Sequence, residues 1–128
     1  MNKLDKKINL VPALFAASVD IFFTLFYQKT SFWRGESVVN ESNPFGRFLS
    51  SYSSLGLPLI CLIWLVIIWF AGLQLPKRIQ EFFLLFCVIA HSWGAASWID
   101  HRFGWWSAIV IFVINSSIYI AVKNKIND

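Results

Sequence analysis

Two ionisable side chains, Asp20 and His91, stand inside segments that are otherwise apolar. A charged group near the centre of a bilayer costs at least ~2.5–3.5 kcal/mol, so residues of this kind usually serve packing or function. A carboxylate beside an imidazole can form a hydrogen-bonded pair, exchange a proton near neutral pH, or bind a metal ion. Asp20 and His91 are therefore the first candidates for chemistry in this chain.

The segments that must position these residues are long and apolar. The chain has 128 residues, of which 57% are hydrophobic and 14% are charged, and a soluble domain of this size cannot bury so much apolar surface. Four stretches are long enough to cross a hydrocarbon core of about 30 Å, namely 8–28, 56–75, 79–99 and 104–122. We therefore predict an all-α membrane protein with four transmembrane helices, forming one polytopic membrane domain over residues 1–128 in the lipid bilayer.

Basic residues flank the predicted spans. Seven of the 11 stand before the first helix, between the second and third helices, or after the fourth: Lys3, Lys6, Lys7, Lys77, Arg78, Lys123 and Lys125. The positive-inside rule then predicts an N-in/C-in topology, with both termini cytoplasmic. Because these charges form no basic face interleaved with aromatic residues, we expect no nucleic-acid partner.

The longest loop, 29–55, is the only sizeable polar region. Pro44 suits the first position of a helix, and apolar side chains then recur at helical spacing: Phe45, Phe48, Leu49 and Tyr52. This pattern predicts a short interfacial helix over about 44–52, on the outer leaflet between helices 1 and 2.

Small residues share a helix face with the candidate residues. In the first span, one face carries Ala13, Ala17, Asp20 and Thr24. In the third span, Ala90, Gly94 and Ser97 form a strip that lies beside His91. Small residues mark the faces that pack on neighbouring helices in membranes, so both faces are predicted to point into the bundle.

Depth in the membrane predicts that the two residues meet. At 1.5 Å per residue, Asp20 and His91 both lie about 18 Å from the inner ends of their helices. Thr24 stands one turn further out and is expected to add a hydrogen bond, while Glu41 and Asn43 lie above the pair on the outer side. Together these five residues are expected to line a polar pocket that opens to the outer face.

Three interpretations of this group stay open. Asp20 and His91 could form a buried hydrogen-bonded pair that only fixes helix packing. Asp20, Glu41 and His91 could instead bind zinc, for which carboxylate and imidazole are suitable ligands, although no tight ligand spacing supports a metal site. An oligomer could also use the pair as part of a proton or ion pathway.

Two motifs in the first half of the chain resemble a known family. Asp20-Ile-Phe-Phe-Thr24 and Glu41-Ser-Asn43-Pro44 resemble an uncharacterised family of small prokaryotic integral membrane proteins. That family has Asp-x3-Thr in its first helix and Glu-x-Asn-Pro in the following loop. The resemblance implies a four-helix fold in a prokaryotic plasma membrane and adds weight to Asp20, Glu41 and Asn43, but it implies no activity.

A second motif resembles a cofactor-binding segment. His91-Ser-Trp-Gly94, followed by Asp100, is similar to the haem-ligating segment of succinate dehydrogenase membrane anchors. The resemblance implies that His91 would ligate haem b and that Asp100 would lie near a quinone pocket. This chain departs from the pattern, because His101 replaces the expected Tyr and four spans replace three.

The leading functional expectation is a small integral membrane subunit, or stabilising partner of a larger membrane complex, with no catalysis of its own and no cofactor. Its partners would be other membrane subunits or further copies of itself. The alternative is a small intramembrane enzyme, or a metal- or ligand-binding protein, that uses Asp20, Glu41, Asn43 and His91. The third is an oligomeric proton or ion pathway.

Overall fold

The computed structural model of the chain describes residues 7–41 and 44–127. Within these ranges the regular elements are helices: α2 (Val11–Phe26), α3 (Thr30–Trp33), α4 (Pro44–Ser50), α5 (Gly56–Gln74), α6 (Lys77–Phe103) and α7 (Trp105–Asn127). Four stretches are long and apolar enough to span a membrane: Lys7–Phe26, Gly56–Gln74, Lys77–Phe103 and Trp105–Ile126. The predicted all-α fold with four membrane-spanning helices is therefore confirmed at the level of length and composition.

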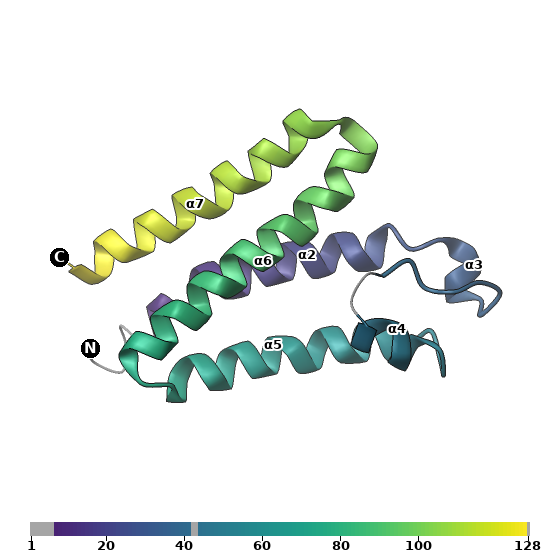
Figure 1. Ribbon diagram of the computed structural model, residues 1–128, viewed down its shortest axis with the longest axis horizontal. Coiled ribbons are helices and arrows are strands. Elements are labelled where there is room, and N and C mark those ends of the chain that lie inside the picture. Colours follow the sequence, from purple (N-terminus) through teal and green to yellow (C-terminus); the bar gives the residue numbers. More distant parts are fainter. Residues whose placement is uncertain (1–6, 42–43, 128) are drawn as a thin grey trace.

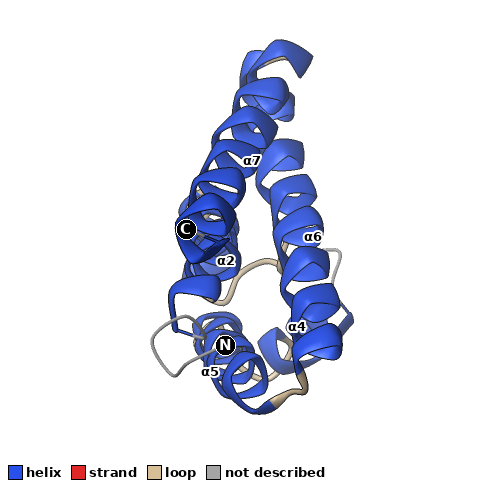
Figure 2. Cartoon of the chain, turned by 90° about the vertical axis from the view of Figure 1, so that its left-hand side faces the viewer, coloured by secondary structure: helices blue, strands red, loops and turns tan. Residues whose placement is uncertain are grey.

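The four long helices run along the length of the molecule, with α6 in a central position (Figure 1). α6 packs most extensively on α2 and α7, while α5 lies against α2 and α6. Seen from one end, α5 and α7 stand on different sides of the α2–α6 pair (Figure 2). The start of α2 and the end of α7 share one end of the bundle, here called the terminal end, and α3 and α4 mark the other, the loop end (Figure 1).

Helix boundaries differ from the predicted ones for local reasons. α2 ends at Phe26, before the predicted residue 28, because Tyr27 leaves the helical conformation. α6 continues past the predicted residue 99 to Phe103, where Gly104 adopts φ +82° and ends the helix. The charged residues 100–102 suggested a loop, but a helix loses nothing by continuing into the polar region beyond the apolar core.

The long loop contains two short helices. α4 covers Pro44–Ser50, close to the predicted 44–52, and packs on α5. α3 was not predicted, since its four residues are too few to show a period. The expected placement of α4 at a membrane surface stays a prediction.

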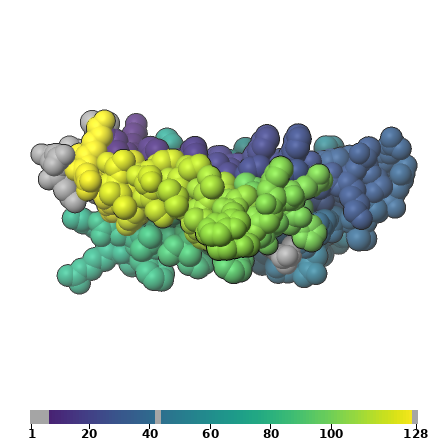
Figure 3. Space-filling model, turned by 90° about the horizontal axis from the view of Figure 1, so that it is seen from above, coloured from purple at the N-terminus to yellow at the C-terminus, as the bar shows by residue number. Residues whose placement is uncertain are grey.

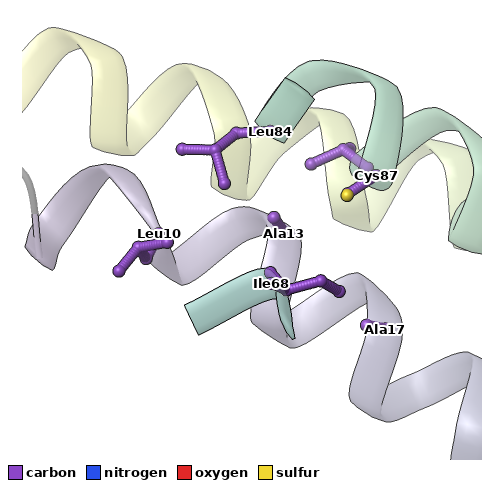
Figure 4. Close-up of a cluster of buried hydrophobic side chains, with 7 residues drawn as sticks. Leu10, Ala13, Ala17, Ile68, Leu84 and Cys87 are labelled. Atoms are coloured by element: carbon purple, nitrogen blue, oxygen red, sulfur yellow. The ribbon is translucent and has the colours of Figure 1, made fainter. Parts of the chain in front are cut away.

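The core in the terminal half is built from small and branched side chains. One buried cluster joins α2, α5 and α6 and contains Leu10, Ala13, Ala17, Ile68, Leu84, Cys87 and Val88 (Figure 4). Alanines on α2 allow the neighbouring backbones to approach closely. A second buried cluster, Ala95, Ala96 and Ile111, joins α6 to α7 nearer the loop end.

The predicted packing strip on the third span is wrong in part. Ala90 and Ser97 are exposed, whereas Ser92 and Ala95 are buried. At 100° per residue, the centre of the buried face of α6 is therefore rotated by roughly 140° from the strip that small residues alone suggested. Gly94 remains at a contact with α2, as the next section describes.

Candidate functional site

α2 and α6 run in the same direction and bring Asp20 and His91 into contact. Asp20 Oδ2 lies 2.7 Å from His91 Nδ1, and the two side chains are 18% and 14% exposed. Two residues that are 71 positions apart in the chain therefore meet inside the helical bundle. The contact joins the polar faces of two helices whose other contacts are largely apolar.

A third side chain, Trp64 of α5, completes the group. Its indole Nε1–H donates a hydrogen bond of 2.6 Å to His91 Nε2. Because an indole nitrogen can only donate, Nε2 must be unprotonated. The remaining proton of the neutral ring is then on Nδ1, where it is donated to the Asp20 carboxylate. The geometry therefore assigns one tautomer to His91 and makes Asp20 the acceptor.

This arrangement leaves no free ring nitrogen on His91. A nucleophile, a metal ion or a haem iron would have to displace either Asp20 or Trp64 to reach the ring. The residues present therefore do not fit haem b, the cofactor that the second motif resemblance implies. Ser92, the residue after His91, also has its hydroxyl in hydrogen bonds with other residues. Its Oγ donates to the Val88 carbonyl at 2.6 Å and accepts from Asn115 Nδ2 at 2.7 Å.

Gly94 makes room for the carboxylate on α6. A Cβ atom at this position would lie 2.5 Å from both carboxylate oxygens of Asp20. Real Cβ contacts are longer than 3.0 Å, so a larger residue would force the Asp20 side chain to move. The absence of a side chain at Gly94 is thus what lets Asp20 lie against the α6 backbone.

Thr24 lies one turn beyond Asp20 on α2 and has a different partner from the expected one. Trp98 Nε1 donates to Thr24 Oγ1 at 3.0 Å, so the threonine hydroxyl bonds a tryptophan rather than the Asp20–His91 pair. The Trp98 indole thereby forms a second polar link between α2 and α6.

The remaining predicted site residues come from the long loop. Glu41 is half-buried and packs over Gly46 of α4, where an added Cβ would lie 2.9 Å from its Cγ. Asn43 lies outside the described residues. Among residues 7–41 and 44–127, no three His, Cys, Asp or Glu side chains are grouped so that they could hold a metal ion.

Trp64 is the member of this group that sequence reasoning missed. The residue stands eight positions into the second span, so it lies about 12 Å from the outer end and about 18 Å from the inner end of a 30 Å core. That is the depth computed for Asp20 and His91. A tryptophan at this depth, away from the interfaces that tryptophans favour, is the signal that could have identified it.

A comparison of the chain with models of protein families, with curated proteins and with solved structures finds no match. The function must therefore follow from the residues and contacts of this chain.

Proposed function

We propose that this protein is a small integral membrane subunit or stabilising partner, without catalysis of its own, that binds other membrane helices through α7. The observation that carries the proposal is the pair of exposed hydroxyls at Ser116 and Ser117. Both lie near the middle of the span Trp105–Ile126, about 16 Å from either end. Neither hydroxyl forms a hydrogen bond with another residue in the described part of the chain.

Unpaired hydroxyls at this depth favour a neighbouring helix over lipid. Hydrocarbon offers no hydrogen-bond partner to a hydroxyl group. Serines at helix–helix contacts in membranes, by contrast, form hydrogen bonds between helices. Ala121 follows Ser117 by four residues and is also exposed, so two small residues share one face. Small residues at this spacing permit the close approach of a second helix.

The rest of α7 is also available for a partner. Among residues 105–126 of this helix, Ile111 and Asn115 alone are buried, both on the side that meets α6. In the space-filling view α7 forms a long ridge on the surface (Figure 3). Because α7 contacts α6 and, less extensively, α2, its remaining faces can meet other subunits in the bilayer.

The Asp20–His91–Trp64 group supports a structural role inside the subunit. Two hydrogen bonds tie together α2, α5 and α6, and they occupy both nitrogens of the ring that an acid–base reaction would need. Such a network can stabilise one packing arrangement of three helices. It supports the proposal because it accounts for a carboxylate in the bundle without invoking a reaction.

A second candidate function rests on the other oxygen of Asp20. Oδ1 accepts no hydrogen bond from a described residue, the side chain is 18% exposed, and Glu41, which contacts Gly46 of α4, lies on the loop-end side. This favours a small hydrogen-bonding or cationic ligand that enters from the loop end. The pathway hypothesis has less support in one chain, because an apolar cluster lies in the terminal half of the bundle: Leu10, Ala13, Ala17, Ile68, Leu84, Cys87 and Val88.

Association through α7 can be tested by mild-detergent purification from native membranes, followed by native mass spectrometry and metal analysis. The wild-type chain is expected to co-purify with a second membrane chain or with further copies of itself. Ser117→Ile should remove that partner. Ala90→Ile, which adds the same kind of bulk to the exposed face of α6, should retain it. A wild-type chain that is monomeric, or a partner retained equally by both variants, would contradict the proposal.

A further inference from the structure

A partly open cavity lies at the loop end, between the segment after α2 and the end of α6. Its volume is about 410 Å³, and it is lined by residues 37–40 together with Gln28, Lys29 and His101. The Asp20–His91–Trp64 group does not contribute to this lining. The cavity is therefore a separate feature of the molecule, and the function proposed above does not use it.

The walls of the cavity are held by hydrogen bonds across residues 28–40. The buried amide of Gln28 donates to the Asn40 carbonyl at 2.9 Å and accepts from the Asn40 N–H at 3.0 Å. A second tie joins the hydroxyls of Ser31 and Ser37 at 2.8 Å. Gly35 turns the chain between them with φ +75°. Because these contacts already close the loop, a ligand would not have to order it.

Three side chains in the lining have polar groups without an intramolecular partner. Lys29, Asn40 and His101 make no side-chain hydrogen bond or ion pair with another described residue. Lys29 offers an ammonium group, Asn40 an amide, and His101 an imidazole that is cationic when protonated. All three groups can donate hydrogen bonds, and no carboxylate is part of the lining.

A further cationic residue adjoins the lining in sequence. Arg102 follows His101 and holds its guanidinium 4.8 Å from the centre of the Tyr27 ring, next to Gln28. The acidic neighbours in sequence are Glu36, Glu41 and Asp100, and none of them belongs to the lining. Lysine and arginine beside hydrogen-bond donors recognise phosphate groups in many proteins.

In a bilayer spanned by these four helices, the cavity would lie near the level of the phosphate groups. Its lining residues follow the end of α2 or belong to the last turn of α6. Exposed aromatic side chains surround the same end of the bundle, namely Trp33, Phe103, Trp105 and Trp106. Such residues favour the level of the lipid headgroups. A volume many times the ~30 Å³ of one liquid water leaves room for a phosphate and its hydration.

We propose that this cavity binds a phosphate group through Lys29, His101 and Asn40. The same chemistry could come from the headgroup of an anionic phospholipid or from a soluble phosphate. The proposal does not depend on the association through α7, because the two involve different residues and different helices.

The test uses the full chain in nanodiscs of phosphatidylcholine with or without phosphatidylglycerol, and inorganic phosphate as the soluble probe. Native mass spectrometry counts the phosphatidylglycerol molecules retained by the wild type. Lys29→Gln and His101→Gln should each weaken binding about tenfold, the loss expected for one charged hydrogen bond. Lys125→Gln, an exposed lysine at the terminal end, is the matched control and should bind like the wild type.

The two sources give different results. Retained phosphatidylglycerol that millimolar inorganic phosphate does not displace would assign the site to a lipid headgroup. Binding of inorganic phosphate that competes with the lipid, and depends on Lys29, would assign it to a soluble phosphate. The proposal is overturned if no probe binds, or if Lys29→Gln and His101→Gln bind as well as Lys125→Gln. All three substitutions replace exposed side chains, so the fold should survive them.

Discussion

Gly94→Ala should destabilise this protein, although the same change usually stabilises a helix. Alanine in a helix interior is about 0.5–1 kcal/mol more favourable than glycine. Here the new Cβ would lie 2.5 Å from both Asp20 oxygens, so the carboxylate must move away from His91. A hydrogen bond to a charged group contributes about 1.5–3 kcal/mol. Subtracting the helix gain from that loss predicts a net decrease of about 1–2 kcal/mol in the free energy of unfolding.

The free energy of unfolding can be measured by SDS titration of the protein in mixed micelles, with far-UV circular dichroism as the readout. In an Asp20→Ala background the clash is absent, so Gly94→Ala should become neutral or stabilising there. Ala90→Gly, on the exposed face of α6, reports the backbone contribution alone. If Gly94→Ala stabilises the wild type as much as the Asp20→Ala variant, the reasoning about this contact is wrong.

Three further predictions concern the hydrogen bonds between the helices. Trp64→Phe removes the indole that donates to His91 Nε2. ¹⁵N NMR of labelled histidine should then show loss of the single Nδ1–H tautomer, and an unchanged spectrum would refute the tautomer assignment. Asp20→Asn keeps an acceptor for His91 and should lower the free energy of unfolding by less than Asp20→Ala, whereas an Asp20→Asn chain that unfolds outright would contradict a packing role. Trp98→Phe should lower the free energy of unfolding by about 0.6 kcal/mol, a typical value for such bonds in membranes. Adding Thr24→Val to that variant should cost little more, since the two residues share one bond; fully additive losses would argue against the contact.

The structure also explains why this carboxylate can lie in an apolar bundle. Asp20 is bonded to a neutral imidazole, and that imidazole is oriented by an indole on a third helix. The contact depends on Gly94, which leaves no side chain between the carboxylate and the α6 backbone. The arrangement therefore requires four residues from three helices, and the loss of any one of them should affect the others.

Part of the candidate site could be predicted from residue type and depth. Asp20 and His91 were expected at one level of the bilayer because helix rise is constant, and the structure brings them within 2.7 Å. The same calculation applied to Trp64 would have added the third member. Depth alone could not show that Thr24 bonds Trp98 or that Ser92 bonds Asn115, because those pairs depend on how each helix is rotated about its axis.

The sequence by itself determined the four apolar spans, because crossing hydrocarbon requires about 20 apolar residues in a row and few charges. It also determined the depth of each polar residue along its helix. Only the tertiary structure decided which face of α6 is buried, since Ala90 and Ser97 were expected inside and are exposed. It alone decided how the loop closes through Gln28 and Asn40. Rotation of helices and loop closure depend on contacts between distant segments, and local patterns do not record those contacts.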